Sequence, residues 1–181
     1  MKFIYSILFL TIFLIACQPK VDNSAEEAFK KNSETVLANL QGFQDENVDY
    51  YSTYSDSVVF ADTGFGGKDS LSLDDIKEND KWLWETFNFK LITDPLVLLP
   101  GVDPETKKSD GSVRYYGEWE LTLPATDSTE GKTAVLKMYE SYDFDDDGKI
   151  LYQQGYGDFT GIMTYLLKEE SSDEMAEEAS E

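Results

Sequence analysis

Two runs of β-forming residues on either side of segment 145–148 constrain the fold of this chain most. The segment reads Asp-Asp-Asp-Gly, and a glycine after acidic residues suits a hairpin turn because it tolerates positive φ. The preceding run alternates in polarity, and one face of it as a strand carries Leu136, Met138, Glu140, Tyr142 and Phe144. We expect the returning run to alternate as far as residue 162, with glycines 155, 157 and 161 bending the sheet.

Glu140 is the acidic residue in that otherwise apolar row. Burial disfavours the ionised form of a carboxyl group, so the pKa of Glu140 rises if the row faces a core. A carboxyl group of this kind is a candidate catalytic acid or base. The alternative is a structural role, either near a sheet edge or in an ion pair with a lysine or arginine.

The turn also matches part of a calcium-binding loop. Asp143, Asp145, Asp147 and Gly148 occupy positions one, three, five and six of an EF-hand, but the twelfth position is Gln154 instead of glutamate. The flanks alternate like strands, whereas an EF-hand requires helices. We therefore predict no metal site and no cofactor.

The first sixteen residues form a secretory signal: Lys2 precedes an apolar run that is too short for an ordinary membrane-spanning helix. The run ends Leu-Ile-Ala-Cys and resembles the lipobox of bacterial lipoproteins. This resemblance implies cleavage after residue 16 and fatty acylation of Cys17, which would anchor the protein in a membrane of the bacterial cell envelope, at the periplasmic or surface side. The alternatives are an ordinary signal peptide or an uncleaved anchor. Residues 17–24 then form a tether.

Composition excludes several classes of function. The chain has no histidine and one cysteine, which excludes Ser-His-Asp and Cys-His catalysis, histidine-bound zinc and an internal disulfide. The formal net charge is −21, so we expect no nucleic-acid partner. The acidic segment 168–181 is predicted to be disordered.

The remaining elements suggest one domain at residues 25–167. Helical periodicity predicts helices at 26–43 and about 47–54, and a capping box of Ser72 and Asp75 begins another that ends near Thr86. Strands are predicted at 57–61, within 87–99 and at 113–123, with a polar loop at 100–112. Helices followed by an antiparallel meander indicate an α+β fold.

Several soft motifs carry a resemblance to the SnoaL-like group of the nuclear-transport-factor-2-like superfamily. They are the Glu-Asn-Val-Asp-Tyr-Tyr that starts at Glu46, segment 54–62, Gly67 at a helix start, and segment 142–150. The resemblance implies a cone, or cystatin-like roll, in which a curved antiparallel sheet is closed by N-terminal helices around a pocket.

The same resemblance implies a site. Some relatives are ketosteroid isomerases or polyketide cyclases, and Asp62 matches the general base of the isomerases while Glu140 lies on the strand of a second acid. Asp158 is a further candidate. The tyrosine that isomerases carry in the first helix corresponds to Ala38, which argues against isomerase activity. The expected pocket lining is Trp82, Trp84, Tyr115, Trp119, Met138, Tyr142 and Tyr156.

We therefore expect a lipid-anchored protein that binds a small, largely apolar ligand or a protein partner, including a second copy of itself through the outer sheet face. The alternative is an envelope enzyme of isomerase, cyclase or hydrolase type that uses paired carboxylates for acid–base chemistry.

Overall fold

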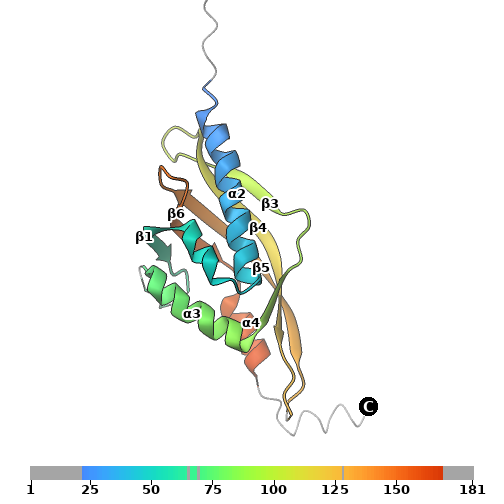
Figure 1. The fold of residues 1–181 in the computed structure, drawn as a ribbon. Coiled ribbons are helices and arrows are strands. Elements are labelled where there is room, and N and C mark those ends of the chain that lie inside the picture. The colour runs from blue at the N-terminus through green and yellow to red at the C-terminus, as the bar shows by residue number, and fades with distance from the viewer. Residues whose placement is uncertain (1–21, 65, 69, 128, 169–181) are drawn as a thin grey trace, which may run out of the picture.

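The computed structural model describes residues 22–64, 66–68, 70–127 and 129–168. Its helices are α2 (Ser24–Gln44), the 3-10 helix η1 (Val48–Thr53), α3 (Leu73–Thr86) and α4 (Phe159–Leu167). Its strands are β1 (Tyr54–Ala61), β2 (Asn88–Leu91), β3 (Val97–Val102), β4 (Ser109–Leu123), β5 (Lys132–Phe144) and β6 (Ile150–Tyr156). The predicted α+β class is confirmed (Figure 1).

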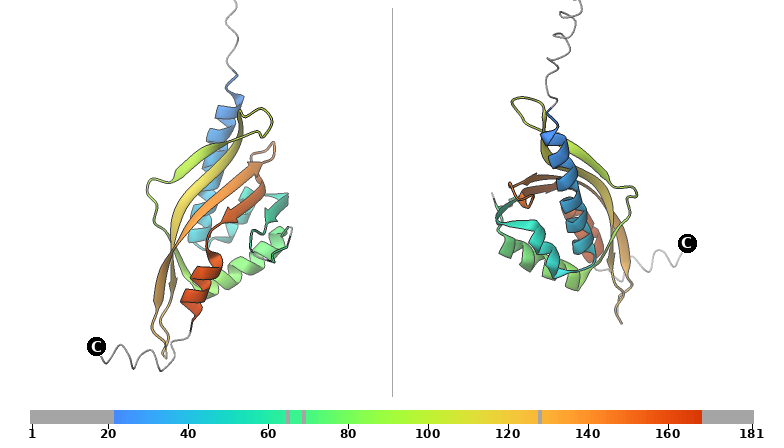
Figure 2. Two further views of the ribbon diagram at one scale, coloured as in Figure 1. Left: turned by 180° about the vertical axis from the view of Figure 1, so that it is seen from behind. Right: turned by 45° about the horizontal axis from the view of Figure 1, so that its top comes forward.

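Within the described residues the strands form one curved sheet in the order β1-β6-β5-β4-β2, with β3 also paired to β4 (Figure 2). The long β4–β5 pair is antiparallel and in continuous register from Val113↔Tyr142 to Leu123↔Lys132. The β5–β6 pair is the predicted hairpin, and Gly148 at its turn has φ of 81°. The β1 strand pairs with β6 in parallel, so the sheet is not a simple meander.

The concave face of the sheet carries the core. Val113, Tyr115, Trp119 and Leu121 of β4 point to the same side as Leu136 and Tyr142 of β5, and all are buried. Helix α2 runs across β4 and contributes Val36 and Leu40, while α3 covers the other end of the concave side (Figure 1). Apolar burial on this face is what closes the helices onto the sheet.

The predicted local signals for the helices are confirmed. Ser72 accepts a hydrogen bond from the backbone N–H of Asp75, and the Asp75 carboxylate accepts one from the backbone N–H of Ser72, which is the capping box at the start of α3. Asn47 caps η1 through the N–H of Asp49, although this turn is a 3-10 helix.

The structure differs from the predicted secondary structure in two segments. Residues 159–162 are not a continuation of a strand but the start of α4, because Asp158 caps that helix and Ile162 and Leu166 bury one face at helical spacing. The expected loop at 100–112 is shorter, because β3 extends to Val102 and β4 begins at Ser109. Pro100 lies on β3, whose one strand partner in the described sheet is β4, so its missing N–H costs no central ladder bond.

The predicted signal segment, the predicted acylation site at Cys17 and nearly all of the acidic tail lie outside the described residues. Within the described residues, no helix is both long and apolar enough to span a membrane.

Candidate functional site

Glu140 lies in the interior of the cone and is 7% exposed. The hydroxyl of Tyr142 donates to its Oε2 at 2.6 Å, and the amide of Gln153 donates to its Oε1 at 3.1 Å. Burial raises the pKa of Glu140, and these two hydrogen bonds oppose the rise in part. The condition for a raised pKa is therefore met, and the partners of Glu140 are neutral groups rather than a lysine or arginine.

The Glu140 network continues to the first strand. Tyr54, at the start of β1, donates through its hydroxyl to the Oε1 of Gln153 at 3.0 Å. Gln153 therefore joins a buried tyrosine on one side to a buried carboxylate on the other. Burial raises the pKa of Tyr54 and of Tyr142, so both hydroxyls keep their protons and serve as donors at neutral pH.

A second buried carboxylate, Asp80 on α3, was not predicted. It is 4% exposed, and its Oδ2 accepts hydrogen bonds from the hydroxyls of Tyr50 and Tyr51. Burial raises the pKa of Asp80, and the two tyrosine hydrogen bonds oppose this. The sequence did contain a signal, since Asp80 falls on the buried stripe of α3 between Ile76 and Leu83.

A layer of tyrosine rings separates the two carboxylates. The rings of Tyr50 and Tyr54 lie edge to face with centroids 5.8 Å apart, and their hydroxyls face Asp80 and Gln153 respectively. The cluster is chemically able to hold protons on neutral acids. The hydrogen-bond donors described for its two carboxylates are all neutral groups.

Asp62 lies at the end of β1 and is exposed. Its Oδ1 accepts from the N–H of Gly64 at 2.9 Å and its Oδ2 from the N–H of Lys68 at 3.2 Å, so it organises the following turn. Ala61, the last residue of β1, pairs with Gln154 of β6. Gly155, which follows Gln154 on β6, pairs with Glu140 of β5. Because β6 lies between β1 and β5, two strand spacings, about 10 Å in all, separate the end of β1 from the backbone of Glu140.

Asp158 has a local role as well. Its Oδ1 accepts from the N–H of Gly161 at 2.9 Å at the start of α4, and the residue is exposed. The acidic turn behaves in the same way, since Asp145 accepts from the N–H groups of Asp147 and Lys149. The structure therefore does not bring the three proposed catalytic carboxylates into contact.

The seven aromatic and methionine residues expected to line the pocket are dispersed. Tyr115, Trp119 and Tyr142 are buried in the core, and Met138 is half-buried beside them. Trp82 is exposed on α3 and packs on Phe87, while Tyr156 is exposed on the outer sheet face. They do not surround one cavity, because alternation and helix geometry turn these side chains to different faces.

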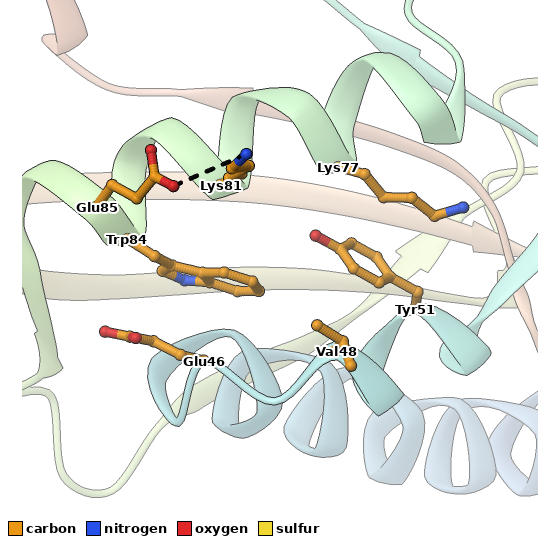
Figure 3. Close-up of a pocket in the computed structure, with 7 residues that line it drawn as sticks. All are labelled: Glu46, Val48, Tyr51, Lys77, Lys81, Trp84 and Glu85. Carbon is orange, nitrogen blue, oxygen red and sulfur yellow. Dashed lines mark ion pairs between the residues drawn. The ribbon is translucent and has the colours of Figure 1, made fainter.

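Trp84 is the expected lining residue that borders a described cavity. It lies in an open groove of about 540 Å³ between α3 and the segment that joins α2 to η1 (Figure 3). The groove is lined by Glu46, Val48, Tyr51, Lys77, Lys81, Trp84 and Glu85. Val48 is 63% exposed, so an apolar side chain faces solvent here.

The hydroxyl of Tyr115 is buried and has no hydrogen-bond partner among the described residues. Its ring lies over Gly117, where a Cβ would overlap the phenol oxygen. The glycine is therefore required by the close approach of this ring and not by a turn.

The structural comparisons support one fold. No family model and no curated protein matches the chain. A phenazine biosynthesis-related protein from Pseudomonas aeruginosa matches at 12% identity and a TM-score of 0.58, over 83% of this chain and 94% of that one. A protein titled as a SnoaL-like polyketide cyclase, from Shewanella denitrificans OS-217, matches at 13% identity and a TM-score of 0.55, over 75% and 96%.

The chain has the SnoaL-like fold. A protein titled as a polyketide cyclase, from Xanthomonas campestris pv. campestris, agrees with a TM-score of 0.60 at 15% identity, over 77% of this chain and 98% of that one. The predicted fold is confirmed. At such identities the likeness extends to the SnoaL-like scaffold and not to its chemistry.

Proposed function

We propose that this protein is a lipid-anchored binding module of the bacterial cell envelope, whose SnoaL-like domain takes up a small, largely apolar ligand in the groove between α3 and η1. The observation that carries the proposal is the groove itself: Val48, Tyr51 and Trp84 present apolar surface in a concavity of about 540 Å³. Cavities of this size suit small molecules, and exposed apolar surface in a hollow commonly marks a binding site.

The interior of the cone supports binding over catalysis. Glu140 and Asp80 are held by neutral donors, and Asp62 and Asp158 are occupied in local turns. A general acid or base must lie within hydrogen-bond reach of the substrate, and the three candidate catalytic carboxylates, Asp62, Glu140 and Asp158, do not line the groove. The enzyme alternative depends on the raised pKa of Glu140 and requires a substrate to enter beside Gly155.

The proposed anchor is compatible with an accessible groove. The N-terminal end of α2, which leads towards residue 17, lies at the end of the molecule away from α3 (Figure 1). Helix α2 has 21 residues. It therefore spans about 30 Å at 1.5 Å per residue, and Glu46 and Val48 follow its far end. An anchor at Cys17 would place the groove away from the membrane surface.

A second candidate function is self-association through the outer sheet face. Val97, Tyr116, Tyr139 and Tyr156 form one row across β3, β4, β5 and β6. Three of them are at least 42% exposed, and the rings of Tyr116 and Tyr139 are 4.9 Å apart. Sedimentation velocity of the Tyr116→Glu variant and the unaltered protein tests this candidate. A dimeric unaltered protein and a monomeric variant would support the interface, whereas equal sedimentation coefficients would reject it.

A neutral apolar dye, N-phenyl-1-naphthylamine, tests the proposed binding site. Val48→Asp puts a charge into the groove at an exposed position and should abolish dye fluorescence enhancement. Val135→Asp, at an exposed position on β5, is the matched control and should retain it. Equal enhancement in both variants would refute the groove as the binding site.

The anchor is tested separately by fractionation and mass spectrometry. The protein should partition with membranes and carry fatty acyl mass on Cys17, and Cys17→Ser should release it. A soluble protein with an unmodified cysteine would refute the anchor and leave the groove proposal in place.

A further inference from the structure

The polar groups of the two aromatic residues that line the groove both have partners within the protein. The indole N–H of Trp84 donates to the carbonyl of Phe43 at 3.1 Å, and the hydroxyl of Tyr51 donates to Asp80 at 3.0 Å. Both polar groups are therefore already engaged in hydrogen bonds. The rings have centroids 6.4 Å apart and are tilted by 43°, which leaves a shallow aromatic floor suited to a planar ring system.

Two lysines of α3 line the groove from one wall. Lys77 and Lys81 lie one helical turn apart on α3, and the Nζ of Lys77 is 5.7 Å from the centroid of the Tyr51 ring (Figure 3). A protein with a formal net charge of −21 repels anions over most of its surface. The two lysines therefore give the groove positive charge on a protein that is otherwise strongly negative.

The present partners of these lysines leave them able to bind a ligand. The Nζ of Lys77 lies 3.0 Å from Asp74, whose side chain is 91% exposed, and the Nζ of Lys81 lies 3.9 Å from Glu85. Exposed ion pairs of this kind contribute little to stability, so exchanging them for a ligand carboxylate costs little.

The charges in the groove are arranged by sign. Lys77 lies at the Tyr51 end, Glu46 and Glu85 lie at the Trp84 end, and Lys81, which pairs with Glu85, lies between them (Figure 3). An anionic group is repelled from the second end and attracted to the first. A bound molecule is therefore oriented with its acid near Lys77 and any hydroxyl or amine near Glu46 and Glu85.

We propose that the groove selects planar aromatic carboxylates, with the ring system against Trp84 and Tyr51 and the carboxylate held by Lys77 and Lys81. The proposal rests on the proposed function, because it names the ligand class of the same groove. The ion pairing supplies specificity and orientation, and the ring contacts supply the larger share of buried area.

Three naphthalene probes of one size and different charge test the proposal by calorimetry with the full chain. They are 2-naphthoate, 2-naphthalenemethanol and 2-naphthylmethylamine. We expect 2-naphthoate to bind about tenfold more tightly than the alcohol, as a charge-assisted contact predicts, and the amine most weakly. Raising the salt concentration should reduce the difference in affinity between 2-naphthoate and the alcohol, because salt screens the charge interaction.

Lysine variants provide the matched controls. The double variant Lys77→Gln, Lys81→Gln should bind 2-naphthoate about tenfold more weakly and bind the alcohol with unchanged affinity. Lys90→Gln, at an exposed lysine on β2, should alter neither. If the alcohol binds as tightly as 2-naphthoate in a Val48→Asp-sensitive manner, the ligand class is wrong and the binding function stands. If Val48→Asp weakens the binding of none of the probes, both the ligand class and the proposed binding function of the groove are wrong.

Discussion

The hydroxyl of Tyr51, a residue that lines the open groove, donates to the Oδ2 of the buried Asp80 at 3.0 Å. The surface site and the buried carboxylate cluster are therefore in direct contact. Tyr50 donates to the same oxygen from the core side, so Asp80 fixes both tyrosines and with them one wall of the groove.

Removing the Asp80 carboxyl group should destabilise the protein markedly. Asp80→Ala leaves the buried hydroxyl of Tyr50 without its acceptor, which costs about 1–3 kcal/mol in addition to the lost packing. Asp80→Asn keeps an acceptor oxygen and should cost less. Urea unfolding curves measure both, and an Asp80→Ala midpoint equal to that of the unaltered protein would show that the contact has no structural role.

The stability contribution of Glu140 should fall as pH rises. Its pKa is higher in the folded protein than the ordinary value of 4.5, so the folded state binds the proton more tightly than the unfolded state. Its contribution is fully present below that value and is lost as pH rises through the folded pKa, with a slope of at most about 1.4 kcal/mol per pH unit.

Glu140→Gln isolates this contribution, because the other titrating groups cancel in the difference between the two proteins. The difference in free energy of unfolding, variant minus unaltered, should increase between pH 4 and pH 8. A difference that is constant or decreases over this range would contradict the raised pKa.

Two buried tyrosines should respond oppositely to loss of their hydroxyls. Tyr115→Phe removes a hydroxyl with no described partner and should leave stability unchanged or raise it by about 1 kcal/mol. Tyr142→Phe is the matched control: it removes the donor to Glu140 and should destabilise by about 1–3 kcal/mol. Thermal unfolding of both variants decides, and a Tyr115→Phe loss equal to that of Tyr142→Phe would reveal a partner for the Tyr115 hydroxyl.

The capping box of α3 gives a surface prediction. Ser72→Ala removes the acceptor for the N–H of Asp75 and should cost about 1 kcal/mol of stability. Ser70→Ala, just outside the helix, should be neutral. Because α3 carries Lys77, Lys81 and Trp84, fraying at its start should also weaken groove binding, and unaltered binding at reduced stability would show that the wall of the groove is held elsewhere.

Local signals in the sequence predicted much of the fold. The alternation around the Asp-Asp-Asp-Gly turn gave the β5–β6 hairpin, and the Ser72–Asp75 pair gave the start of α3. The strand predicted at residues 159–162 was wrong because a short apolar stretch with glycines fits both a strand and a helix. Here Asp158 caps the stretch, and it forms a helix. The parallel β1–β6 pairing depends on tertiary contacts that periodicity does not report.

The site was less predictable. An acid in an apolar row marked Glu140 as a candidate site residue, and the same test applied to α3 would have found Asp80. The groove could not be predicted, because its walls come from α3 and from the segment after α2, and only the packing of these elements brings Val48 beside Trp84. The catalytic role expected of Asp62 followed from a resemblance, and its carboxylate is engaged by the backbone of its own turn.

Titration of the isotope-labelled full chain with 2-naphthoate, followed by the backbone amide signals, tests the central claim most directly. We predict that the largest shifts occur at Val48, Tyr51, Lys77 and Trp84, which line the groove. Shifts centred on Met138, Glu140 and Gly155 would place the ligand inside the cone and contradict the account.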